Sequence, residues 1–77
     1  MNASVELGPK KERREESDRR MLRAAMALIR KKGISGANLA QIGLDAGYSK
    51  GLPVQRFGTK LALLIAVLDA IEDRFLR

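Results

Sequence analysis

The chain has 77 residues, no cysteine, no histidine and a net charge of +6, which suits one small domain without disulfides. The missing residue types exclude a thiolate or imidazole metal centre, and no cofactor is expected. An enzyme is disfavoured, because no pair of carboxylates lies near a plausible pocket. The positive balance favours a polyanionic partner, either nucleic acid or an anionic membrane surface.

Membrane insertion and secretion are not expected. The longest apolar run, residues 61–68, is far shorter than the roughly 20 residues needed to cross a bilayer. The N-terminus lacks the cationic start and apolar stretch of a secretory signal, so we expect a cytoplasmic protein. Its positive charge is concentrated, because Lys50, Arg56 and Lys60 lie in a segment, residues 46–66, that contains no acidic residue.

Residues 1–16 are predicted to form a disordered charged arm. They contain few apolar residues, a Gly8-Pro9 break and charges of both signs, so they cannot bury enough surface to offset the entropy of an ordered chain. Arg13 and Arg14 could reach a neighbouring DNA groove or phosphate, as flexible basic arms do. The alternative is a solvated tail whose charges largely cancel.

A first helix is predicted from Ser17, where apolar residues begin to recur at helical spacing. Ser17 or Asp18 would cap its first amides, and Gly33 would end it by adopting a left-handed conformation. The buried face is predicted to consist of Met21, Leu22, Ala25, Met26, Leu28 and Ile29.

Two short helices joined by a turn are predicted next. The first begins after Asn38 as its N-cap, and Gly43 within it would let another helix approach closely. Ser49 would cap the second, which carries residues 50–57 with Pro53 in its first turn, where few amides have partners. A turn of this kind between two helices is how a helix-turn-helix presents a recognition helix to DNA.

Residues 61–77 are predicted to form a fourth helix capped by Thr59, with an unusually broad apolar surface. Because much of this helix is apolar on nearly every side, something must cover its outer face. Three explanations stay open: a C-terminal domain absent from this chain, a second copy packed on the side of Leu63, Val67 and Ala70, or a three-helix core that takes up most of the run. The main apolar stripe consists of Leu61, Leu64, Ile65, Leu68, Ile71 and Phe75.

Several short motifs stand at a spacing shared with one protein family. They are Met21-Leu22, Ala24-Ala25, Leu28, Gly33, Ile42-Gly43, Ala46-Gly47-Tyr48-Ser49, Gly51, Phe57 and Thr59-Lys60. Together they resemble the N-terminal domain of the TetR family of transcriptional repressors. The resemblance implies an all-α fold: a small homeodomain-like three-helix helix-turn-helix bundle in residues 17–60, plus a connecting fourth helix in residues 61–77. In that family a larger C-terminal domain binds a small molecule and forms the dimer, so this chain would start such a domain and hold no ligand pocket itself.

The resemblance also implies a function, which is sequence-specific binding of double-stranded DNA and repression of transcription by a homodimer. It places Lys50 near base edges or phosphate, Gln55 facing the groove and Lys60 on a phosphate. Further DNA-binding candidates are Arg56, also toward the groove, and Asn38, Tyr48 and Gly51.

One departure from the family pattern is that Pro53-Val54 replaces its Leu-Tyr pair, so a tyrosine that commonly contacts phosphate is missing. Each candidate also has a simpler interpretation. Lys50 and Lys60 could be ordinary surface lysines, Arg56 could lie along the domain with its stem packed, and Tyr48 could pack against the third helix.

Two other classes of function remain as alternatives. A small basic helical module could dock on an acidic partner protein through its apolar fourth helix. A membrane-surface peptide would also combine cations with an apolar helix, and it would gain helix on anionic vesicles. The turn at residues 47–49 has no purpose in that last case.

Overall fold

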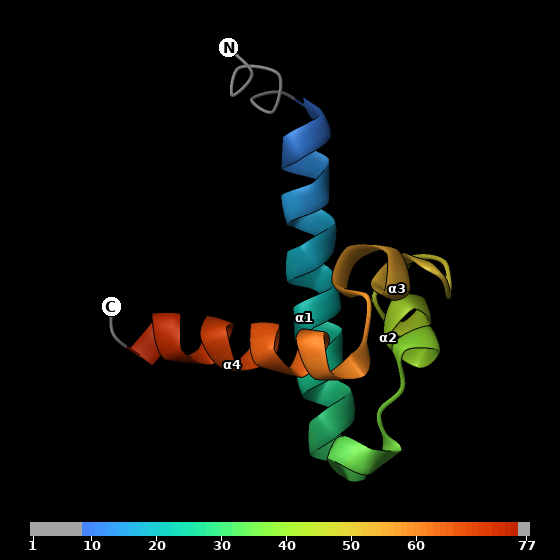
Figure 1. The fold of residues 1–77 in the computed structure, drawn as a ribbon, viewed down its shortest axis with the longest axis vertical. Helices are drawn as coiled ribbons and strands as arrows, with labels where there is room; N and C mark the ends of the chain where they lie inside the picture. The colour runs from blue at the N-terminus through green and yellow to red at the C-terminus, as the bar shows by residue number, and fades with distance from the viewer. Residues whose placement is uncertain (1–8, 76–77) are drawn as a thin grey trace.

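Four helices form the part of the chain that the structure, a computed structural model, describes: residues 9–75, with side chains to Arg74. They are α1 (Pro9–Gly36), α2 (Leu39–Asp45), α3 (Leu52–Phe57) and α4 (Lys60–Phe75). Helix α4 runs across α1, and α2 and α3 lie together beside α1 (Figure 1). Helices α2 and α3 pack on each other, while α1 packs on α2 and α4. The all-α, four-helix prediction is confirmed within the described residues.

The predicted disordered arm is wrong for residues 9–16, because α1 begins at Pro9; residues 1–8 lie outside the described residues. Proline is well tolerated at a helix start, and a helix already nucleated by packing extends easily through Lys, Arg and Glu. Glu16 adds pairs with Arg19 at 2.7 Å and Arg20 at 2.8 Å, at the i+3 and i+4 positions. Helix α1 therefore extends from its packed part toward the N-terminus as far as Pro9.

The predicted caps of α1 are consequently wrong. Ser17 lies inside the helix, is 8% exposed, and its hydroxyl donates to the Arg14 carbonyl at 2.9 Å. The predicted break at Gly33 is confirmed, since its φ of 79° and ψ of 169° interrupt the helix before a last short turn to Gly36. A side chain is strongly disfavoured in that conformation, which is why glycine stands there.

The core lies where α1, α2 and α4 meet. Its buried apolar residues are Met21, Ala25, Leu28, Ala37, Ile42, Leu63 and Val67. The predicted buried face of α1 is therefore confirmed in its centre, while its flanks, Leu22, Met26 and Ile29, are half-buried against the core. Phe57 is half-buried against the same core and holds the end of α3 to it.

The structure contradicts one of the three explanations for the apolar surface of α4, the packing of a second copy on the side of Leu63, Val67 and Ala70. Leu63 and Val67, assigned to an outer pairing surface together with Ala70, are buried in the core. Leu61, Ile65 and Leu68 from the predicted stripe are instead 68%, 52% and 64% exposed. Both faces are apolar, so hydrophobic spacing could not distinguish them. The side chain of Phe75 lies outside the described residues.

Helices α2 and α3 are closely joined. Asn38 caps α2 as predicted, its Oδ1 accepting from the Gln41 amide at 2.8 Å. Gly43 admits α3, because a Cβ there would lie 2.9 Å from Pro53 Cδ and collide with the Ser49 carbonyl oxygen. Ser49 does not cap α3, which begins later than predicted with Gly51 as its N-cap and no side-chain capping bond. The Ser49 carbonyl instead accepts from the Leu52 amide at 3.3 Å in a turn.

Candidate nucleic-acid interface

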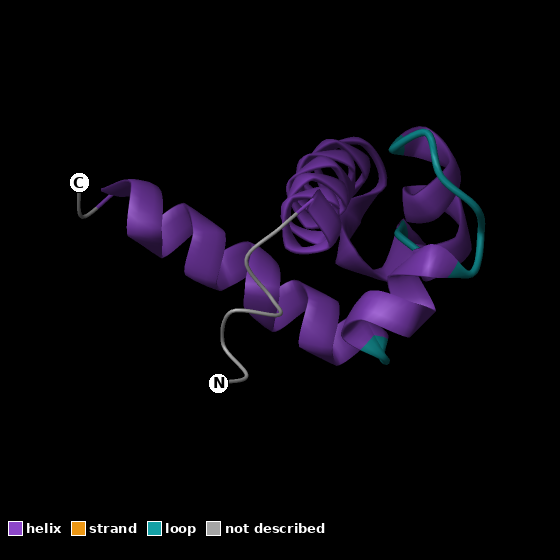
Figure 2. Ribbon diagram, turned by 90° about the horizontal axis from the view of Figure 1, so that it is seen from above, coloured by secondary structure: helices purple, strands orange, loops and turns teal. Residues whose placement is uncertain are grey.

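The turn between α2 and α3 is built from backbone hydrogen bonds. The Tyr48 amide donates to the Gly43 carbonyl at 2.9 Å, and the Gly47 amide donates to the Leu44 carbonyl at 3.0 Å. Gly47 has a φ of 90°, the positive value that lets the chain reverse here. Figure 2 shows this loop at the edge of the molecule away from the C-terminal end of α4. The turn therefore presents α3 at the periphery.

The turn and the outer side of α3 carry exposed polar groups. Lys50 and Gly51 lie in the turn and Gln55 lies on α3, and all three are exposed. Lys60 is the first residue of α4 and is partly exposed. The break between α3 and α4 contains Thr59, whose Oγ1 accepts from the Ala62 amide at 3.1 Å, as predicted for a cap. Both lysines thus flank α3 within a stretch of sequence, residues 46–66, that contains no acidic residue.

Two residues predicted to contact DNA, Asn38 and Tyr48, have structural roles in the fold. Asn38 is exposed, but its side-chain oxygen is occupied as the N-cap of α2. Tyr48 is half-buried and packs against the core, which agrees with its packing interpretation. Val54, in the place of the family's tyrosine, is 51% exposed on α3. The outer side of α3 is therefore partly apolar.

Arg56 is directed at α1. Its Nε donates to Asp18 Oδ1 at 2.8 Å and its Nη2 donates to Asp18 Oδ2 at 2.7 Å. The hydrogen bond to the Asp18 carboxylate raises the pKa of Arg56 above its ordinary value. The placement agrees with the interpretation in which Arg56 lies along the domain, and it separates Arg56 from the outward-facing Lys50 and Gln55.

Arg13 and Arg14 lie on the N-terminal part of α1, which projects beyond the other helices (Figure 1). Arg13 is exposed and Arg14 is half-buried. They are therefore carried on a helix and not on the flexible arm predicted for them. Their distance from any DNA is set by the direction of α1.

Asp18 is the polar residue whose role the sequence interpretation missed. Its position was informative, because it precedes Met21 by three residues and Ala25 by seven, on the same face of a helix. An acidic side chain on the buried face of a helix calls for a partner. That partner is 38 residues away, so local sequence did not identify it.

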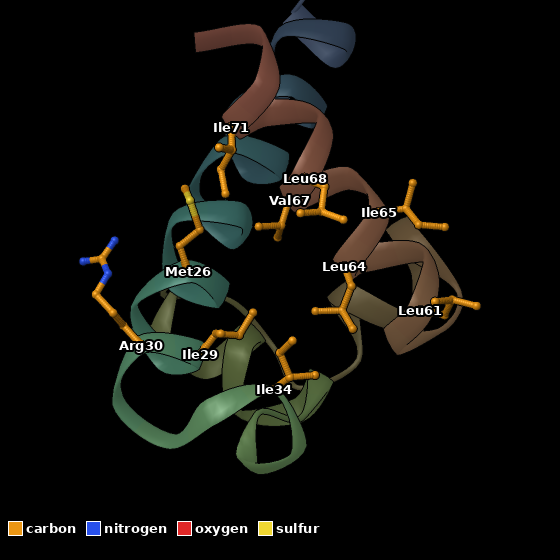
Figure 3. A pocket seen from close by; sticks show the side chains of 10 residues that line it. All are labelled: Met26, Ile29, Arg30, Ile34, Leu61, Leu64, Ile65, Val67, Leu68 and Ile71. Carbon is orange, nitrogen blue, oxygen red and sulfur yellow. The ribbon is translucent and has the colours of Figure 1, made fainter. Parts of the chain in front are cut away.

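An open apolar groove of about 460 Å³ runs between α1 and α4. Its walls come from the second half of α1 and the exposed side of α4, with Arg30 as the charged residue at its edge (Figure 3). Its apolar lining consists of Met26, Ile29, Ile34, Leu61, Leu64, Ile65, Val67, Leu68 and Ile71.

Membrane and metal features are limited. None of the helices in residues 9–75 combines the length and apolar character of a membrane span. Within the same residues no group of three or more acidic side chains is placed to hold a metal ion.

Comparisons with known proteins give one consistent description. A family model described as bacterial regulatory proteins, tetR family, matches residues 21–67. The HTH-type transcriptional regulator CymR of Pseudomonas putida is 34% identical over 63 residues, which cover 82% of this chain and 31% of CymR. The chain thus spans about a third of the length of this curated relative. No solved structure matches it.

Proposed function

The chain belongs to the tetR family of bacterial regulatory proteins, and we propose that it binds double-stranded DNA through α3 and regulates transcription. The observation that carries this proposal is the exposed part of the turn and α3, which together with Lys60 lies on an acid-free stretch of sequence. The exposed residues there are Lys50, Gly51, Val54 and Gln55. Such a helix fits the major groove, and its cations suit the phosphates on either side.

The exposed residues divide by role. Lys60 binds a phosphate, which would also meet the positive end of the α4 dipole. Gln55 faces base edges, where a glutamine pairs best with adenine. Lys50 serves base edges or phosphate, and the neighbouring Gly51 has open space around it that lets DNA come close.

We further propose that the active regulator is a dimer and that it represses transcription. One unit with a few phosphate contacts would bind DNA nonspecifically with a Kd of roughly 10⁻⁴ to 10⁻⁶ M at physiological salt. Two recognition helices about 34 Å apart would read successive major-groove faces of a near-palindromic site. Such pairing supplies the specificity that one small surface lacks.

The exposed side of α4 supports pairing between two copies of this chain. Ile65 and Leu68 border the groove, and Asp69 and Glu72 follow them, while Arg30 lies at the opposite wall. Two copies related by a two-fold axis could join these apolar surfaces and place the acidic end of one α4 near the basic end of the other α1. Residues beyond those of this chain could also form the dimer, because in the resembled family a larger C-terminal domain does so.

Selection of bound duplexes from a random pool tests the function. An enriched half-site is expected, and enrichment of paired half-sites at a fixed spacing would support the dimer. Fluorescence anisotropy with a random duplex at 50 mM salt gives the complementary measurement, because phosphate contacts are strongest at low salt. Absence of binding there would overturn the proposal.

The apolar groove favours a second candidate, a module that docks on an acidic partner protein through α4. In that case an Ile65→Lys change would abolish partner capture without altering DNA affinity. Loss of duplex binding by Lys60→Ala in a folded protein would argue against this candidate as the main function.

A further inference from the structure

The ion pair between Asp18 and Arg56 joins α1 to α3, two helices that do not form one of the principal packings of the fold. Helix α3 packs on α2 and α4, and α1 also packs on α2 and α4. The two hydrogen bonds between Arg56 and Asp18 therefore restrain the movement of α3 relative to α1, which core packing alone restricts less.

The pair is also sheltered in comparison with the other ion pairs of α1. The Arg56 and Asp18 side chains are 31% and 27% exposed. In the pair of Arg19 with Glu16, which lies within α1, the corresponding values are 57% and 45%. A bidentate guanidinium–carboxylate pair with less solvent around it holds its geometry better than an exposed one.

The charge of Arg56 is compensated where it stands. The carboxylate of Asp18 occupies Nε and Nη2, two of the donors through which a guanidinium binds phosphate. Lys50, by contrast, is exposed and forms no ion pair within residues 9–74. The cation in the turn and the cation on α3 thus differ in what they can offer to DNA.

We propose that Asp18 is a positioning residue for DNA recognition, which fixes α3 against α1 and withholds the Arg56 guanidinium from the phosphates. This inference rests on the proposed DNA-binding function. Asp18 thereby lowers indiscriminate affinity and favours readout by the outward side chains of α3. A charge that contacts phosphate raises binding to every sequence, whereas a fixed helix improves the difference between sequences.

The Asp18→Asn variant tests the proposal, because it keeps the shape of the side chain and removes its charge. We expect tighter binding to a random duplex and a plot of log affinity against log salt that is steeper by about one, since one more phosphate is neutralised. The gain in affinity of Asp18→Asn over the wild type should be about threefold larger at 50 mM than at 200 mM salt. The preference for a selected duplex over the random one should fall.

Three variants control for charge and folding. Glu15→Gln makes the same charge change at an exposed site on α1 and should leave the slope unaltered. Asp18→Asn combined with Arg56→Ala should lose the gain in slope. The exchange Asp18→Arg with Arg56→Asp should restore the pair and the wild-type slope, and it keeps the test informative if Asp18→Asn folds poorly by circular dichroism.

The outcomes separate this inference from the function on which it rests. No binding of the random duplex by the wild-type chain would overturn both. Wild-type binding with the same slope in a folded Asp18→Asn protein would overturn the positioning role alone. A lower slope in Arg56→Ala would do so too, because it would show that Arg56 already contacts phosphate.

Discussion

The Pro53 ring packs against the backbone of Gly43, with its Cδ 2.9 Å and its Cγ 3.1 Å from where a Gly43 Cβ would stand. Real Cβ atoms essentially never approach as closely as the first of these distances, and the Ser49 carbonyl oxygen adds a further collision. A residue of the shared motifs, Gly43, and a departure from the family pattern, Pro53, therefore meet in one contact. That contact sets how near α3 lies to α2.

Gly43→Ala is expected to destabilise the domain by about 1–3 kcal/mol, as overpacking of a tight core does. Helix propensity alone predicts the opposite, a gain of up to about 1 kcal/mol. Urea unfolding followed by circular dichroism measures the difference. The matched control is Gly51→Ala, which meets no atom within 4 Å and has a negative φ, so it should change stability little. A stabilised Gly43→Ala protein would contradict the close approach.

Two substitutions of Asn38 should distinguish its role as the cap of α2 from its role on the surface. Asn38→Ala is expected to cost about 1 kcal/mol of stability, because the Gln41 amide loses its acceptor. Asn38→Asp should keep the cap and the stability but weaken DNA binding, since it adds a negative charge to the exposed start of α2. Thermal unfolding and anisotropy on the same proteins measure the two effects. Equal stability of Asn38→Ala and wild type would show that the cap contributes nothing.

Substitutions on α4 should distinguish its two apolar faces. Leu63→Ala is expected to cost about 2–5 kcal/mol, because this side chain is fully buried. Leu68→Ala should cost about 0.5 kcal/mol or less, because Leu68 is 64% exposed. Denaturant unfolding of dilute protein gives both values. Similar losses of stability at the two positions would mean that the outer face of α4 is covered. Sedimentation velocity of Ile65→Lys and wild type would then show whether a second copy covers it.

Lys60 and Gln55 should affect binding in different ways. Lys60→Ala is expected to weaken all duplexes about equally and to lower the salt slope by about one, as the loss of a phosphate contact does. Gln55→Ala should leave the slope unchanged and relax the preference at one base pair, at a cost of about 1–3 kcal/mol. Anisotropy titrations over several salt concentrations, with the selected and the random duplex, measure both. A uniform loss for Gln55→Ala would assign it to the backbone of the DNA.

The features that local chemistry controls were predictable from the sequence. Asn38 and Thr59 cap the helices that follow them, because a cap needs a side-chain oxygen and an amide three residues later. Gly33 and Gly47 take positive φ values, because only glycine does so at little cost. The centre of the core in α1 follows from spacing of apolar residues on one side of a helix.

Two outcomes depended on the tertiary structure. Which face of α4 is buried could not be read from the sequence, because Leu63 and Leu68 are equally apolar and only packing across α1 chooses between them. The partner of Arg56 is an aspartate 38 residues earlier, and no short-range pattern connects the two. Capping and turn geometry are decided within a few residues of chain, whereas burial of a face and pairing of distant charges exist only once the helices have assembled.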